Sequence, residues 1–237
     1  MMIASLLRRP LLRRPVLRRL APLLGVVLLA TAAGPARDWS SATRELPNGA
    51  FVTGNPAAPI KIVEYGSYTC SHCAAFATES RAVLRGSMIR SGKVSLEYRH
   101  MIRDRLDLGA AVLARCGRAR GFVGASETIF ANQSAWLKKV IDWQTDHPEA
   151  TQLDPPAQIR AYVRAAGLDT IMKARGLTQP AIDACLANRT EIDRIVKMTG
   201  DAPIEVRGTP AFYVDGVLQP ASTWATLEPV LRAKGAK

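Results

Sequence analysis

Two cysteines separated by two residues form the segment with the clearest chemistry in this sequence, Cys70-Ser71-His72-Cys73. On a helix, side chains three positions apart lie on adjacent turns, so the two sulfur atoms can form and break a disulfide without backbone movement. A helix start also favours the thiolate of a cysteine, through its free amide groups and its dipole. His72 adds a hydrogen-bond donor or a positive charge beside the same sulfur. The segment therefore indicates a redox-active pair, with Cys70 as the attacking thiol and Cys73 as the resolving thiol.

A lowered pKa at Cys70 would set the direction of electron flow. A free thiol, with a pKa of about 8.5, is mostly protonated at neutral pH. A Cys70 pKa of about 5 would stabilise the dithiol form at pH 7 by about 2.7 kcal/mol, which corresponds to about 60 mV toward oxidising potential. We therefore expect a protein that gives its disulfide away, an oxidant rather than a reductant.

A metal site and a purely structural disulfide are the other interpretations of the same cysteines. The remaining cysteines, Cys116 and Cys185, are isolated, and no second C-x-x-C or H-x-x-H pair accompanies the motif, which disfavours zinc. A disulfide that encloses two residues constrains little chain entropy, which disfavours a structural role. We expect no metal, and no cofactor besides the Cys70–Cys73 disulfide itself.

The segments around the motif alternate between strand and helix. Residues 60–65 are rich in β-branched side chains and predict a buried strand. Thr69 is a natural N-cap, which would place Cys70 at the first position of a helix that runs to about Arg85 and stops at Gly86. Residues 94–98 alternate as a second strand.

The rest of the chain is predicted to be helical until a hairpin near its end. Residues 107–199 show only helical periodicity, broken at Gly117, at Gly121, around the prolines near 155, and at Gly176. Residues 211–218, with the turn Asp215-Gly216, predict a hairpin, and an amphipathic helix follows over 222–233. This order predicts an α/β core interrupted by a large α-helical insertion. The expected segments are a signal peptide over 1–33, a flexible arm over 34–50, core over 51–106, insertion over 107–200, and core over 201–237.

The first 33 residues have the composition of an export signal. Six arginines and no acidic residue occupy the first 19 positions, and an apolar run of 14 residues follows from Leu20 to Ala33. Small residues end the run, as a signal-peptidase site requires. A membrane-spanning helix needs about 20 apolar residues, which favours cleavage over retention as an anchor. We therefore expect export to the periplasm.

The charge balance argues against a nucleic-acid partner. The formal net charge is +12, but the six arginines of the leader account for half of it, leaving 26 basic and 20 acidic residues. The sequence shows no basic stripe interleaved with aromatic side chains, which single-strand binding requires. We expect no nucleic-acid binding.

The segment Glu64-Tyr65-Gly66-Ser67-Tyr68-Thr69-Cys70-Ser71-His72-Cys73 resembles the active-site segment of the DsbA family of disulfide oxidoreductases. The resemblance extends over about residues 50–235 and implies a thioredoxin fold with a helical insertion. It implies that Cys70 is the attacking cysteine, Cys73 its buried partner and His72 the histidine that favours the thiolate. Ser71 departs from the proline common at that position, and the residue there tunes the redox potential.

The resemblance also assigns roles to three other residues. Thr209-Pro210 stands directly before the predicted hairpin, where thioredoxin-fold proteins place a cis-proline opposite the disulfide. In the family, the residue before this proline, here Thr209, pairs its backbone with an extended substrate. Glu64 matches an acidic residue beneath the disulfide that can pass protons to the resolving thiol. A strand-end carboxylate that reaches solvent is the alternative for Glu64.

Cys116 and Cys185 lie on separate predicted helices of the insertion. In an oxidising compartment an even number of cysteines favours pairing, and we expect these two to form a structural disulfide. Two buried free thiols and a second redox relay are the alternatives. His100 and His147 have no partner pattern, and we expect His100 to be a loop residue that follows the second strand.

Together these features predict a periplasmic protein that oxidises newly exported, reduced and unfolded proteins by thiol–disulfide exchange. The resemblance implies a quinone-linked membrane partner of the DsbB kind that reoxidises Cys70 and Cys73. A disulfide isomerase or reductase, which keeps Cys70 reduced, is the nearest alternative, and a periplasmic chaperone that uses the same groove is another. We expect a monomer, because isomerases of this type carry an N-terminal dimerisation domain and only about 15 polar residues precede the fold here.

Overall fold

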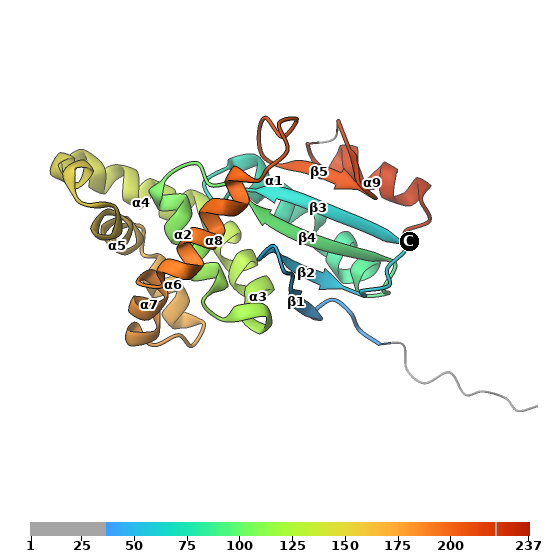
Figure 1. Ribbon diagram of the computed structural model, residues 1–237, viewed down its shortest axis with the longest axis horizontal. Coiled ribbons are helices and arrows are strands. Elements are labelled where there is room, and N and C mark those ends of the chain that lie inside the picture. Colours follow the sequence, from blue (N-terminus) through green and yellow to red (C-terminus); the bar gives the residue numbers. More distant parts are fainter. Residues whose placement is uncertain (1–36, 221) are drawn as a thin grey trace, which may run out of the picture. The chain divides into compact units, whose positions relative to one another are not determined.

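The computed structural model describes residues 37–220 and 222–237 (Figure 1). The predicted signal peptide over 1–33 and the start of the predicted arm lie outside the described residues. The strands are β1 Thr43–Glu45, β2 Phe51–Gly54, β3 Ile60–Gly66, β4 Val94–His100, β5 Ala211–Val214 and β6 Val217–Leu218. The α-helices are α1 Ser71–Ser80, α2 Arg105–Arg115, α3 Arg118–Ala131, α4 Gln133–Asp146, α5 Pro155–Ala166, α6 Leu168–Ala174, α7 Gln179–Leu186, α8 Arg189–Gly200 and α9 Trp224–Ala233. A π-helix, η1, spans Arg81–Ile89, and a 3₁₀-helix, η2, spans Pro148–Gln152.

The strands form one six-stranded sheet in the order β1-β2-β4-β3-β5-β6. Strands β3 and β4 are parallel, and every other neighbouring pair is antiparallel. Strand β3 is an inner strand, and all of its residues except Lys61 and Val63 are buried. Such nearly continuous burial is typical of a strand covered by helices on both faces. Helices α2 to α8 separate β4 from β5 in the chain, and α2 and α4–α7 gather beyond one end of the sheet (Figure 1). The predicted α/β core with a large helical insertion is confirmed.

Two hydrophobic clusters support this arrangement. One joins β3 and β5 to α1, η1 and α9, with Ile62, Phe76 and Leu227 among its fully buried members. The other fills the insertion and reaches the active-site segment, with Trp136 at 1% exposure as its largest side chain. No helix in the described part of the chain combines the length and the apolarity needed to cross a membrane.

The flexible arm predicted over 34–50 contains a strand, so that prediction is wrong for residues 43–45. Strand β1 pairs with β2, which in turn pairs with β4. The hydroxyls of Thr43 and Thr53 lie 2.9 Å apart across the β1–β2 pair. These polar residues have only a weak local preference for a strand. They join the edge of the sheet because β2 offers them backbone hydrogen bonds.

The start and the end of the predicted 69–85 helix also differ from the prediction. Cys70, rather than Thr69, is the N-cap of α1, with extended backbone angles. The hydroxyl of Thr69 is instead near Ser67 Oγ at 3.2 Å and Asp104 Oδ2 at 3.4 Å. Gly86 does not end the helix, because η1 continues through it to Ile89. Gly121, a predicted break, likewise lies within α3.

Candidate active site

Cys70 and Cys73 lie at the amino end of α1, where backbone N–H groups have no partner within the helix. The sulfur of Cys70 is 3.2 Å from the carbonyl oxygen of Thr209. Cys70 is 5% exposed and Cys73 is fully buried, and both are free thiols in this structure. Of the two sulfur atoms, a molecule in solution can therefore reach that of Cys70 first.

The surroundings of Cys70 favour its thiolate. A hydrogen bond from the Cys73 thiol, a hydrogen bond at Thr209 and the backbone N–H groups of Cys73 and His72 lower the pKa of Cys70 to about 5, although burial opposes this shift. The hydrogen bond to Cys70, burial and the nearby Glu64 raise the pKa of Cys73 well above the usual thiol value. At neutral pH the pair thus consists of an anionic Cys70 and a neutral Cys73.

Ser71 and His72 are the two residues between the cysteines. Both side chains are exposed on the first turn of α1. The backbone N–H of His72 is among the groups that lower the pKa of Cys70. An imidazole charge at this exposed position is screened by solvent. The backbone N–H groups at the helix start thus act on Cys70 as the sequence predicts, and the role of the His72 imidazole stays a prediction.

Glu64 lies within β3 and is only 3% exposed. In the sheet it is paired with Tyr98 of β4 and Phe212 of β5. Burial raises the pKa of Glu64 to about 8, and the negative charge of Cys70 adds to this shift. The carboxyl group is therefore mostly protonated at pH 7, and it lies within electrostatic reach of Cys73.

Thr209 and Pro210 form the wall opposite the start of α1. The peptide bond between them is cis. Pro210 is buried and Thr209 is half-buried. Strand β5 begins at the next residue, Ala211, and pairs with Tyr65 of β3, five residues before Cys70. This pairing places the Thr209 carbonyl group beside the Cys70 sulfur, where an extended chain could also bind.

Two buried residues of the insertion hold the loop before Cys70, and sequence reasoning missed both. The carboxylate of Asp107 accepts hydrogen bonds of 2.7 Å from the Ser67 hydroxyl and the Tyr68 N–H. The amide of Gln133 donates to the carbonyl oxygens of Tyr68 at 2.7 Å and Cys70 at 2.8 Å. Asp107 stands in the first turn of α2, where an acidic residue looks like an ordinary helix-end charge. The insertion is thus part of the active site's support.

Removing the Gln133 amide should destabilise the active-site loop. In Gln133→Leu the carbonyl oxygen of Tyr68 loses its donor, whereas that of Cys70 keeps the Ala74 N–H at 3.2 Å. A buried unpaired acceptor costs about 1–3 kcal/mol. We expect the free energy of unfolding in urea to fall by about 2 kcal/mol. Gln144→Leu, at a half-buried position near the other end of the same helix, α4, is the control and should change it by less than about 0.5 kcal/mol. Equal effects from both changes would contradict this role.

The ionised Cys70 should make the stability of the reduced protein depend on pH. Its folded-state pKa of about 5 lies below the value of about 8.5 in an unfolded chain, so the stabilisation is complete above pH 8.5 and disappears as the pH falls through 5. At pH 7 the contribution is about 2.7 kcal/mol. We expect the stability of the reduced form, relative to the oxidised form, to fall by about 2 kcal/mol between pH 7 and pH 5. Urea unfolding of both forms measures this, and a pH-independent difference would contradict it.

Cys116 and Cys185 lie apart from this site. They are joined by a disulfide between the end of α2 and α7, with Cα atoms 5.7 Å apart and a sequence separation of 69 residues. In residues 37–220 and 222–237, no three His, Cys, Asp or Glu side chains are grouped as metal ligands. His147 stacks on Trp143 within the insertion.

His100 is not the loop residue that the sequence predicted. It is the last residue of β4 and is 1% exposed. Its ring lies 5.2 Å from the ring of Tyr98 and 5.9 Å from that of Tyr68, and neither ring nitrogen has a hydrogen-bond partner among the described residues. Burial and the charge of Arg115 lower its pKa well below the usual value. His100 is therefore a neutral packing residue behind the active-site loop.

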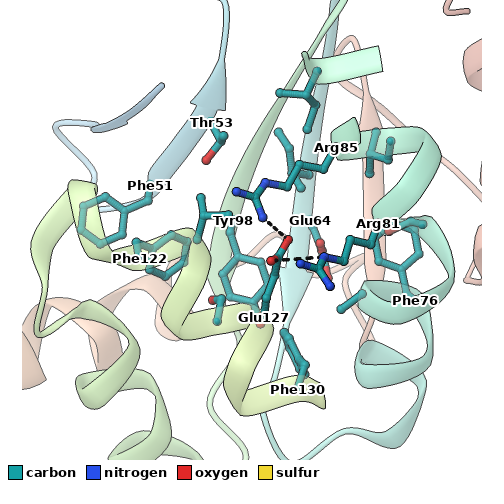
Figure 2. Close-up of a pocket in the computed structure, with 17 residues that line it drawn as sticks. Phe51, Thr53, Glu64, Phe76, Arg81, Arg85, Tyr98, Phe122, Glu127 and Phe130 are labelled. Atoms are coloured by element: carbon teal, nitrogen blue, oxygen red, sulfur yellow. Dashed lines mark hydrogen bonds and ion pairs between the residues drawn. The ribbon is translucent and has the colours of Figure 1, made fainter. Parts of the chain in front are cut away.

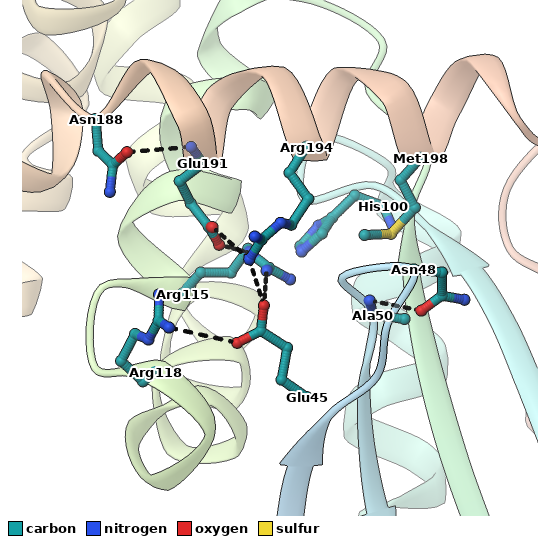
Figure 3. A network of polar contacts seen from close by, with 10 residues as sticks. All are labelled: Glu45, Asn48, Ala50, His100, Arg115, Arg118, Asn188, Glu191, Arg194 and Met198. Carbon is teal, nitrogen blue, oxygen red and sulfur yellow. Dashed lines mark hydrogen bonds and ion pairs between the residues drawn. The ribbon is translucent and has the colours of Figure 1, made fainter.

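A network of charged side chains joins the sheet edge to the insertion (Figure 3). Arg115 at the end of α2 is fully buried and donates from Nε to Glu191 of α8 at 2.5 Å. Its Nη2 is 3.8 Å from Glu45 of β1, which also pairs with Arg194 of α8. Three segments distant in the sequence therefore share one set of ion pairs. Removing the carboxylate of Glu191 would leave the positive charge of the buried Arg115 without its nearest partner, which would lower the stability of the fold.

Comparison with known proteins agrees with this geometry. The family model described as Thioredoxin matches residues 47–233. A Rickettsia typhi protein named "putative protein-disulfide oxidoreductase" is 28% identical over 178 residues, which cover 74% of this chain and 58% of that protein. A similar Rickettsia prowazekii protein of the same name is 27% identical over 178 residues, covering 74% of this chain and 57% of that protein. The chain thus spans less than two thirds of these relatives.

Solved structures show the same fold over most of the described chain. A protein-disulfide isomerase from Novosphingobium aromaticivorans superposes with a TM-score of 0.73 at 29% identity, covering 77% of this chain and 95% of that one. Alpha-DsbA1 from Wolbachia pipientis superposes with a TM-score of 0.59 at 21% identity, covering 82% of this chain and 94% of that one. The predicted thioredoxin fold with a DsbA-like helical insertion is confirmed.

Proposed function

This chain belongs to the thioredoxin family, and we propose that it is a thiol:disulfide oxidoreductase that donates a Cys70–Cys73 disulfide to exported proteins. The observation that carries the proposal is the asymmetry of the pair. Cys70 is stabilised as a thiolate and retains some exposure, whereas Cys73 is buried and stays protonated. A stable leaving thiolate favours release of the disulfide to a substrate.

The proposed reaction has two steps that balance. A substrate thiolate attacks the sulfur of Cys70, the Cys70–Cys73 bond breaks, and Cys73 takes up a proton. A second substrate thiolate then attacks the substrate sulfur of this mixed disulfide and releases Cys70 as a thiolate. The substrate loses two electrons and the cysteine pair gains them. Glu64 is suited to supply the proton to Cys73, since its carboxyl group is protonated at neutral pH.

The substrate is proposed to bind as an extended chain beside Thr209 and Pro210. The backbone of Thr209 lies next to the Cys70 sulfur, and pairing through backbone groups demands no particular side chains. This suits a general oxidant of reduced, unfolded proteins in the periplasm. A membrane partner linked to quinones, of the DsbB kind, would reoxidise Cys70 and Cys73, and Cys116–Cys185 would serve as a structural disulfide.

Oxidation of a reduced, unfolded model protein tests the proposal. We expect the oxidised protein to accelerate disulfide formation, and Cys70→Ser to reduce the rate to that of the uncatalysed reaction. With the oxidised form of the same model protein, the Cys70 thiolate of Cys73→Ser should attack a substrate disulfide, displace one substrate thiolate and accumulate as a mixed disulfide, because the resolving thiol that would release it is absent. Glu79→Gln, an exposed change on the same helix, is the control and should retain the rate. Catalysis that survives Cys70→Ser would overturn the proposal.

A disulfide isomerase is the second candidate, favoured by the similarity to the Novosphingobium aromaticivorans protein of that name. An isomerase must keep Cys70 reduced in order to attack wrong disulfides. The redox equilibrium with glutathione separates the two functions. A strongly oxidising potential supports the oxidase, whereas a reducing potential together with reactivation of a scrambled substrate supports the isomerase.

A further inference from the structure

A cavity of about 100 Å³ lies beneath the active-site helix (Figure 2). Its walls come from α1, η1 and α3, and its floor comes from β2, β3 and β4. The cavity thus lies where the sheet, the active-site helix and the insertion meet. An engineered apolar cavity of about 150 Å³ binds benzene, so an aromatic ring would enter this smaller cavity only when the side chains at its edge shift outward.

The walls are largely aromatic. Five aromatic side chains line the cavity: Phe51, Phe76, Tyr98, Phe122 and Phe130. Their rings already pack against one another in tilted and edge-on arrangements, with centroid distances of 4.6 Å between Phe51 and Phe122 and 5.9 Å between Tyr98 and Phe122. Such arrangements are the ones that aromatic rings prefer. A further ring would therefore find matching partners on several sides.

Two of the polar side chains that line the cavity, those of Glu64 and Tyr98, are buried on the sheet. The carboxyl group of Glu64 faces the cavity (Figure 2) and is protonated at neutral pH, so it can donate or accept a hydrogen bond. The hydroxyl of Tyr98 is buried and has no hydrogen-bond partner among the described residues. Burying polar groups without partners is costly. An uncharged ligand with one hydroxyl group would supply a hydrogen-bond partner here. An ion would bind poorly, because it would lose its hydration in an apolar site.

Three charged side chains line one side of the cavity and form ion pairs with one another. Glu127 of α3 is 3.4 Å from Arg81 and also pairs with Arg85, both of η1. The Arg81 side chain is 66% exposed, and exposed ion pairs contribute little stability. Arg81 can therefore swing aside at little cost, whereas Arg85 and Glu127 are partly buried and would have to part for a small molecule to reach Glu64.

We propose that this cavity is a binding site for a small, uncharged aromatic molecule with one hydroxyl group, of the phenol class. The ring would lie among Phe76, Phe122 and Phe130, and the hydroxyl group would bond to Glu64. The site needs no thiol chemistry, so the proposal goes beyond the oxidoreductase function. Failure of one proposal leaves the other standing.

Phenol and toluene are the probes that test this site. Toluene carries a methyl group where phenol carries a hydroxyl group, and the two molecules have nearly the same size. We expect phenol to produce saturable chemical-shift changes at residues lining the cavity and to raise Tm. Toluene should bind about tenfold more weakly, as expected for one lost hydrogen bond. In Glu64→Leu the preference for phenol over toluene should disappear.

A matched pair of variants on α1 locates the binding. Ala77→Leu fills the cavity and should abolish binding, whereas Ala75→Leu, at an exposed position outside it, should leave binding unchanged. Phenol that produces no saturable change would show that internal water alone occupies the cavity and would overturn the proposal. Equal binding by Ala77→Leu and the wild type, or an unchanged preference in Glu64→Leu, would also overturn it.

Discussion

Replacing Glu64 with glutamine should stabilise the protein by about 3.6 kcal/mol at pH 7. The folded-state pKa of Glu64 is raised to about 8, mainly by burial, whereas a glutamate in an unfolded chain has a pKa of about 4.3. Between these values the folded state holds a proton that the unfolded state has released. Stability therefore decreases as the pH rises from about 4 to 8, and the cost persists above pH 8. Glutamine fills the same space and has no proton to release.

Urea unfolding of the wild type and Glu64→Gln at pH 5 and at pH 8 measures this effect. The two proteins should differ by about 1 kcal/mol at pH 5, with the gap widening to about 4.6 kcal/mol at pH 8. Glu97→Gln, on the adjacent strand but half-buried, is a control for the loss of a carboxylate. A gap of the same size at both pH values would show that Glu64 is not a buried acid held in its protonated form.

Removing the disulfide between Cys116 and Cys185 should lower the free energy of unfolding by about 4 kcal/mol. The bond closes a loop with a sequence separation of 69 residues, and a loop of that length loses much conformational entropy in the unfolded chain. The expected effect is comparable to that of deleting a large core side chain.

The double variant Cys116→Ala/Cys185→Ala tests this contribution. Its stability is compared with that of the wild type in urea, with Cys70 and Cys73 oxidised in both proteins. We expect the midpoint to fall and the m-value to rise, because the unfolded chain becomes more extended without the crosslink. A loss below about 1 kcal/mol would mean that strain in the folded state offsets the entropic gain.

The sequence predicted the central features because each has a strong local signal. The β-branched run of β3, the hairpin turn at Asp215-Gly216 and the helical periodicity of the insertion correspond to elements of the structure. The C-x-x-C spacing singled out Cys70 and Cys73 for the same reason, since both cysteines lie in one short segment at a helix start.

The remaining features depend on contacts that no local pattern shows. Strand β1 forms because β2 lies beside it, and Asp107 and Gln133 matter because the insertion folds back over the loop before Cys70. His100 is buried because α8 covers the end of β4, where Met198 accepts a bond from the His100 N–H.

The contact between Cys70 and Thr209 has a consequence for how the chain acquires its structure. The two residues are 139 positions apart in the sequence, and the whole insertion lies between them. Contacts of such high sequence separation form late, because the intervening chain must first be ordered. Under the export proposed above, both cysteines would emerge long before Thr209. During that interval Cys70 would lack one of the groups that lower its pKa in the folded protein.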